Sequence, residues 1–189
     1  VGISLGGNAL LRWAEEAGET AASSVRALAA VSSPIDLTAG GHAIGRGFNR
    51  QVYTRMFIRS LRPKALLKLA MHPGLFNREK MLCAGDLYDF DNLYTAPVHG
   101  FRNTDDYWLR GSAKPHLHRI RIPALVLNAR NDPFVPAASL PRPQDVGDHV
   151  TLWNPEHGGH AGFASGGFPG QLQPMHERVA GWLRARAGV

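Results

Sequence analysis

Two helices are indicated by apolar residues that recur every three or four positions. Residues 6–17 show this spacing, and Gly18 follows directly as a natural helix end. Residues 171–186 show it again near the end of the chain. Both segments are predicted to be amphipathic helices with one face against a core. The second presents Met175, Val179, Trp182 and Leu183 on that face.

Three short apolar runs indicate buried strands. Residues 25–31 end before serine and proline, residues 124–128 read ALVLN, and residues 149–153 read HVTLW. Runs of this length that are bounded by turn residues are typical of parallel strands covered on both faces. Strands that alternate with helices predict an α/β fold, with a mostly parallel sheet flanked by helices.

The middle of the chain has a different pattern. Residues 37–115 contain short helix-like pieces separated by Gly, Pro and Asn. They predict a helical cap inserted into a core made of residues 1–36 and 116–189. The glycine-rich segment 40–47 lacks the Lys-Ser/Thr of a phosphate-binding loop, so we expect a flexible hinge there. The expected helical pieces are 47–61, 64–71, 77–83 and 104–110, with a break at Arg62-Pro63.

Composition narrows the class of protein. The 189 residues are 44% hydrophobic and contain no apolar run long enough for a transmembrane helix, so we expect no stable membrane insertion. The single cysteine, Cys83, excludes an internal disulfide and predicts a reducing compartment, the cytoplasm. The net charge is +6, but the basic stretches Arg46–Arg62 and Pro115–Arg121 hold no run of five like charges. We therefore expect no nucleic-acid partner; a binder of nucleic acid or anionic lipid stays open on charge alone.

The first residues carry the most informative motif. Gly2-Ile3-Ser4-Leu5-Gly6 matches G-x-S-x-G, a turn that presents a nucleophilic serine between a strand and a helix. Side chains two residues before and after Ser4 are expected to collide, so both positions need glycine. The helix that follows favours negative charge at its N-terminus. The amide of Leu5 is the expected oxyanion-hole donor.

An acid and a base for this serine are found beyond two other predicted strands. Asp132 follows the ALVLN strand, and His160 follows the HVTLW strand between glycines. The order serine, aspartate, histidine is that of one known class of hydrolases with a catalytic triad. His157 is a rival base from the residues alone. A metal site of His157 and His160 with Glu156 or Asp132 is a weaker alternative, because the spacing fits no common zinc motif.

Three stretches of the chain resemble the α/β-hydrolase superfamily, and within it the YheT-like branch of esterases (AB-hydrolase type 4). They are Gly2–Asn8, then Tyr94-Thr95-Ala96-Pro97 through Tyr107, then Asp132-Pro133-Phe134 with Glu156 to Phe163. The resemblance implies an α/β-hydrolase fold with a helical cap and a serine hydrolase of carboxylic esters. The implied substrates are esters with a short- to medium-chain or lipid-like acyl group. Some members of this branch transfer the acyl group to an alcohol.

The resemblance also assigns roles to residues. It implies Ser4 as nucleophile, Asp132 as acid and His160 rather than His157 as base, with no metal or organic cofactor and a small-molecule ester as partner. Asn131 stands where the family often has a second aspartate. In members of the family, many residues precede the serine. We therefore expect this chain to be the C-terminal portion of a hydrolase, without the N-terminal strands and without a strand that leads into Ser4. The alternative is a truncated, non-catalytic fragment or interaction module.

Overall fold

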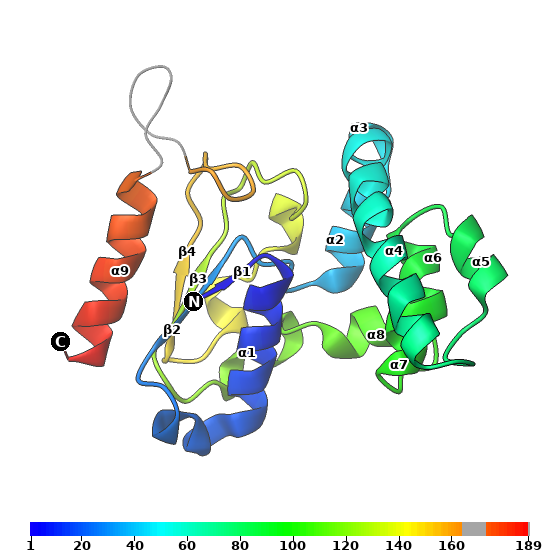
Figure 1. The fold of residues 1–189 in the computed structure, drawn as a ribbon. Coiled ribbons are helices and arrows are strands. Elements are labelled where there is room, and N and C mark those ends of the chain that lie inside the picture. Colours follow the sequence, from blue (N-terminus) through cyan, green and yellow to red (C-terminus); the bar gives the residue numbers. More distant parts are fainter. Residues whose placement is uncertain (164–172, 189) are drawn as a thin grey trace. The chain divides into compact units, whose positions relative to one another are not determined.

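The structure is a computed structural model that describes residues 1–163 and 173–188 (Figure 1). The chain divides into two compact units. The first, here called the sheet unit, contains Val1–Asp36 and Ser112–Val189. The second, the helical unit, contains Leu37–Gly111, so it ends slightly before the predicted limit at residue 115.

The sheet unit is built on four parallel strands in the order β1-β2-β3-β4. Three of them confirm the predicted strands. The prediction that no strand leads into Ser4 was wrong, because Gly2 and Ile3 pair with Ala30 and Val31. A two-residue strand has no periodicity of its own and is created by its neighbour. The strands are β1 (Gly2–Ile3), β2 (Leu28–Val31), β3 (Ala124–Leu127) and β4 (Val150–Trp153).

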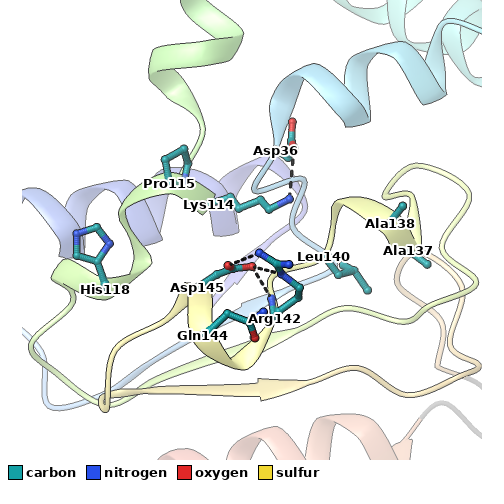
Figure 2. A pocket seen from close by; sticks show the side chains of 10 residues that line it. All are labelled: Asp36, Lys114, Pro115, His118, Ala137, Ala138, Leu140, Arg142, Gln144 and Asp145. Atoms are coloured by element: carbon teal, nitrogen blue, oxygen red, sulfur yellow. Dashed lines mark hydrogen bonds and ion pairs between the residues drawn. The ribbon is translucent and has the colours of Figure 1, made fainter.

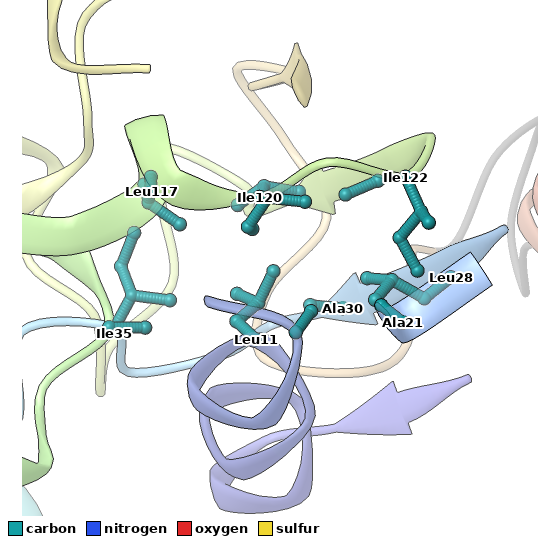
Figure 3. Packing of buried hydrophobic residues seen from close by; sticks show 12 residues of the cluster. Leu11, Ala21, Leu28, Ala30, Ile35, Leu117, Ile120 and Ile122 are labelled. Atoms are coloured by element: carbon teal, nitrogen blue, oxygen red, sulfur yellow. The ribbon is translucent and has the colours of Figure 1, made fainter. Parts of the chain in front are cut away.

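Helices cover both faces of this sheet. Alternate residues of β2 and β3 point to opposite faces, as the strand period of two requires. Leu28 and Val126 pack with the cluster around α1 (Leu5–Ala17) and the 3₁₀ segment η4 (Lys114–Arg119), as Figure 3 shows in part. Ala29 and Leu125 pack with the cluster that contains Met175 and Val179 of α9 (Gln173–Ala187). This confirms the expected apolar face of α9; the predicted positions 171 and 172 lie outside the described residues.

The helical unit corrects two expectations. The predicted hinge at residues 40–47 was wrong in part, because α2 (Leu37–Ile44) includes Gly40 and Gly41. A Cβ at Gly41 would lie 2.4 Å from the Trp108 ring, so glycine is there to let the indole approach the helix. The predicted break at Arg62-Pro63 was also wrong, because α4 (Arg55–Met71) continues through Pro63. Tertiary packing of Ile58 and Ala65, on either side of the proline, offsets the lost hydrogen bond.

The remaining elements are short. In the helical unit they are α3 (Gly47–Asn49), α5 (Arg78–Cys83), α6 (Leu87–Phe90), α7 (Ala96–Val98) and α8 (Thr104–Gly111), with π-helical turns at Arg50–Thr54 and Asp91–Thr95. In the sheet unit they are 3₁₀ segments at Gly18–Ser23, Ala137–Ser139 and Pro143–Asp145. No helix among the described residues has the length and apolar character needed to span a bilayer.

Glu15 gives the sheet unit a predicted pH dependence. Its side chain on α1 is 1% exposed, and burial raises its pKa from 4.5 to about 8 although Arg12 donates to it at 2.9 Å. The folded protein therefore holds this proton more tightly than the unfolded chain, and the contribution of Glu15 to stability declines as pH rises from 4.5 to about 8. Relative to wild type, Glu15→Gln should gain a few degrees in Tm across this range.

Thermal unfolding of both proteins at several pH values checks this expectation. Glu16→Gln is the matched control, because Glu16 also accepts a hydrogen bond from Arg12 and is exposed. Parallel Tm curves for wild type and Glu15→Gln would contradict it.

Candidate active site

Ser4 lies on a strained turn between β1 and α1. Its φ is 54°, in the left-handed region that residues with a side chain seldom adopt. Two hydrogen bonds hold the turn: Ser4 N donates to the carbonyl of Val31 at 2.9 Å, and Gly7 N donates to the carbonyl of Ser4 at 2.9 Å. Strain of this kind persists only where neighbouring structure fixes the backbone, and it is concentrated at functional sites.

The steric reason for the glycines is only partly the predicted one. A Cβ at Gly2 would lie 2.6 Å from the backbone of Gly6 and Gly7, as expected. The expectation for Gly6 was wrong, because a Cβ built there has no described atom within 4 Å apart from its chain neighbours and the backbone of its own helix. Gly7 is the tight position instead, since its Cβ would lie 1.8 Å from Ser33 Oγ. The turn after β2 thus sets a requirement that the five-residue motif does not contain.

The amide of Leu5 is in the first turn of α1, where backbone N–H groups have no partner within the helix. These groups and the helix dipole favour negative charge beside Ser4. Asn8, which is buried, fixes this end of the helix: its Oδ1 accepts a hydrogen bond from Ala113 N at 3.0 Å. The start of α1 is therefore held rigidly against the chain that returns from the helical unit.

Asp132 is placed by the turn that follows β3. Its side chain is fully buried, and its Oδ1 accepts a hydrogen bond from Phe134 N at 2.8 Å. This bond fixes the carboxylate in one orientation. Asp132, Ser4 and His160 all follow parallel strands, and the carboxyl ends of such strands meet at one edge of a sheet.

His160 connects the other two side chains. Its Nε2 lies 3.0 Å from Ser4 Oγ, and its Nδ1 lies 2.9 Å and 3.1 Å from Asp132 Oδ2 and Oδ1. The ring also packs against Phe134, with centroids 4.5 Å apart. The structure thus brings Ser4, Asp132 and His160 together, whereas His157 is exposed and has no such position.

Asn131 holds the loop that carries His160 through two hydrogen bonds. Its Oδ1 accepts hydrogen bonds from Gly158 N and Gly159 N, each at 2.9 Å. Gly158 also admits no side chain, since a Cβ would lie 2.4 Å from the Phe163 ring. The sequence identified Asn131 only as a missing second carboxylate and missed this contact. Its position beside Asp132 and the Gly158-Gly159 pair were the available signals.

Asn131→Ala should loosen this loop without removing any triad side chain. With two backbone N–H groups left unpaired, His160 samples other positions, and kcat for an ester substrate should fall about tenfold. Asn131→Asp keeps an oxygen acceptor and should restore most of the rate. Steady-state kinetics on the three proteins checks this. Equal loss in both variants would mean that the amide does more than accept these two hydrogen bonds.

A metal site is not supported by the geometry. Both ring nitrogens of His160 face Ser4 and Asp132. In the part of the chain that the structure describes, no three His, Cys, Asp or Glu side chains gather as metal ligands would. The metal alternative of the sequence therefore has no counterpart in these residues.

A hollow of about 820 Å³ lies elsewhere on the sheet unit (Figure 2). Lys114 forms an ion pair with Asp36 at 3.7 Å, and Arg142 binds Asp145 through two nitrogens. These charges are paired with one another, and Ser4, Asp132 and His160 are not among the lining residues. The hollow is therefore not the place where the serine would react.

The fold and the serine turn define a class of protein, the α/β hydrolases. Residues 1–166 match the family described as alpha/beta hydrolase fold, and the chain belongs to that family. A solved structure with this fold is a monoacylglycerol lipase from Paleococcus ferrophilus. It aligns with a TM-score of 0.51 at 18% identity, covering 98% of this chain and 67% of that one. This likeness shows the fold alone.

Sequence relatives confirm the YheT-like branch. The chain is 35% identical over 185 residues to "Putative esterase YheT" of Escherichia coli (strain K12), covering 97% of this chain and 54% of that protein. It is 28% identical to mouse "Phospholipase ABHD3", covering 92% of this chain and 42% of that protein. It is 27% identical to human "Monoacylglycerol lipase ABHD2", covering 98% and 47%. The chain thus spans about half the length of these relatives, whose names are those of ester hydrolases.

Proposed function

We propose that the protein is a serine hydrolase of carboxylic esters, with Ser4 as nucleophile, His160 as general base and Asp132 as the acid that orients His160. The observation that carries the proposal is the continuous chain of contacts from Asp132 through both nitrogens of His160 to Ser4 Oγ. This is the relation of nucleophile, base and orienting group that acyl transfer requires.

In the first step the Ser4 hydroxyl attacks the ester carbonyl. His160 Nε2 accepts the hydroxyl proton, and the buried carboxylate of Asp132 holds the proton on Nδ1 and stabilises the imidazolium. The oxyanion forms beside the first turn of α1, where the Leu5 amide donates to it. Collapse of the tetrahedral intermediate breaks the bond to the alkoxy oxygen. This oxygen takes the proton from His160 and leaves as the alcohol, and the acyl group stays on Ser4.

The second step repeats the first with water as nucleophile. His160 takes a proton from water, the hydroxide attacks the acyl-enzyme, and Ser4 Oγ leaves and recovers its proton. The carboxylic acid is released. An alcohol in place of water gives a new ester by the same path, which is the acyltransferase activity proposed for this site. The chemistry needs no metal or organic cofactor.

The substrate class is proposed from the relatives. Their names specify monoacylglycerol and phospholipid, both of which are carboxylic esters with apolar acyl chains. A short- to medium-chain or lipid-like acyl ester is therefore the substrate proposed for this protein. Cytoplasmic location stays a prediction from the sequence.

Covalent labelling with a fluorophosphonate probe tests the proposal. The natural protein is used at its full expressed length, because the relatives are about twice as long as this chain. Wild type should be labelled on Ser4, and Ser4→Ala should not be labelled. Ser24→Ala is the matched control, since Ser24 is an exposed serine of the same unit. Absence of labelling in wild type would exclude an activated serine and favour a non-catalytic module.

A further inference from the structure

The longest helical segment of the helical unit carries an apolar surface that faces away from the unit's own core. α3, the π-helical turn Arg50–Thr54 and α4 follow one another directly from Gly47 to Met71 (Figure 1). One side of this segment is buried, with Thr54 1%, Ile58 5% and Ala65 2% exposed. The other side is exposed to solvent and carries several large apolar side chains.

We name this exposed row the apolar stripe. Phe48 is 71% exposed, Leu67 67% and Met71 72%, and Val52 and Met56 are 43% and 54% exposed. Successive members of the row are four residues apart, except for the step of seven from Met56 to Pro63. A helix turns about 100° per residue, so these steps keep the row on one face. Single exposed apolar residues need no explanation, but a contiguous exposed row indicates an interaction site. Its members are Phe48, Val52, Met56, Pro63, Leu67 and Met71.

Positive charges flank the stripe. Arg55 and Arg59 are exposed along one side, and Lys64 and Lys68 are exposed along the other, each pair four residues apart. From Arg46 to Lys68, both included, the sequence contains seven Lys or Arg and no Asp or Glu. Although the whole chain has a net charge of only +6, the segment that carries the stripe therefore has charges of one sign.

We propose that the apolar stripe docks the protein on the surface of a bilayer that contains anionic phospholipid. The helix would lie in the plane of the interface, with Met56 and Leu67 among the acyl chains. Arg55, Arg59, Lys64 and Lys68 would contact the phosphate groups on either side. An apolar centre with cationic edges is the arrangement of interfacial amphipathic helices.

Charge excludes a second copy of the same surface as the occupant, because two such faces would repel each other. A polynucleotide would use the cations but would leave the aliphatic centre of the stripe without a partner. The bilayer surface satisfies both kinds of side chain at once. This docking is independent of the proposed reaction, since it concerns binding rather than ester cleavage.

Vesicle co-sedimentation tests the proposal on the full expressed protein with Ser4→Ala, which keeps the lipids intact. The probes are vesicles of phosphatidylcholine alone and of phosphatidylcholine with phosphatidylglycerol in equal amounts, at about 0.1 M salt. Binding to the anionic vesicles should be at least tenfold stronger, a preference of about the size that a few surface cations confer. Equal binding to both vesicles, or binding to neither, would overturn the proposal.

Two double variants separate the apolar and the charged contributions. Met56→Ser with Leu67→Ser removes the centre of the stripe, and Arg55→Gln with Arg59→Gln removes one charged edge. Each should weaken binding to anionic vesicles about tenfold or more. Because all four side chains are exposed, circular dichroism should show unchanged folding.

Matched controls remove similar groups elsewhere. Leu109→Ser removes an apolar side chain that is 68% exposed on α8, and Arg184→Gln with Arg186→Gln removes two exposed charges on α9. Both should bind vesicles within about twofold of the parent protein. Stripe variants that bind as the controls do would overturn the proposal. Tight binding of a duplex DNA, with none to vesicles, would overturn it in favour of a nucleic-acid surface.

Discussion

Replacing Ser4 with alanine should lower the rate of ester hydrolysis by about four to six orders of magnitude. The hydroxyl that lies 3.0 Å from His160 Nε2 is the only group of the triad that can form the acyl-enzyme, so its loss removes the covalent step. The structural cost should be small, because alanine fits the same turn. Hydrolysis of a chromogenic short-chain ester, followed under steady state, measures the effect.

Two comparisons make the Ser4 result specific. The variant Ser4→Ala with His160→Ala should be no slower than Ser4→Ala alone, since the residues of a triad act as one unit. Ser24→Ala, on the exposed end of the segment after α1, should retain full activity. A Ser4→Ala protein that keeps more than about a hundredth of the wild-type rate would refute the role of Ser4 as nucleophile.

Asp132→Asn should have the second largest effect, a loss of about 10⁴ in kcat with the fold intact. The carboxylate faces His160 Nδ1 at 2.9 Å and also accepts the amide of Phe134. Asparagine keeps the shape, but with its oxygen on Phe134 N its amide donates toward the ring. His160 then carries its proton on Nε2 and can no longer accept the proton of Ser4. Steady-state kinetics with a chromogenic ester measures the loss.

The control for this substitution is Asp145→Asn, which changes an aspartate that pairs with Arg142 away from the triad and should leave kcat unchanged. Asp132→Asn should also slow fluorophosphonate labelling of Ser4 rather than abolish it. If Asp132→Asn were as active as wild type, the tautomer of His160 would not depend on this carboxylate, and the proposed role of Asp132 would be wrong.

The sequence predicted the elements that have their own periodicity or composition. The spacing in residues 6–17 predicted α1, and the runs around Leu28, Ala124 and Val150 predicted three strands of the sheet. The signal for these segments is local, because the spacing of apolar residues within a helix or a buried strand shows which face is buried. The order of Ser4, Asp132 and His160 behind successive strands was sufficient to suggest that they meet.

Elements that depend on a distant neighbour were missed. β1 exists because Gly2 and Ile3 pair with β2, and α4 continues through Pro63 because buried side chains on both sides of the proline hold it. In the same way, Gly41 admits the Trp108 ring and Gly7 admits Ser33. None of these contacts can be inferred from the spacing of residues along the chain, because each joins segments whose distance is set by the fold.

The sequence by itself determined the parallel α/β sheet, the helical segment between its strands, and the residue types of the candidate triad. Residue spacing left His157 and His160 open, and the resemblance to the family favoured His160. Only the tertiary structure showed that His160 lies against Ser4, that Asn131 holds the loop of His160, and that six apolar side chains are exposed on a segment with cationic edges. The physical reason is that periodicity records whether a residue is buried. The identity of its partner depends on loops and crossovers, whose paths are fixed only when the whole core packs.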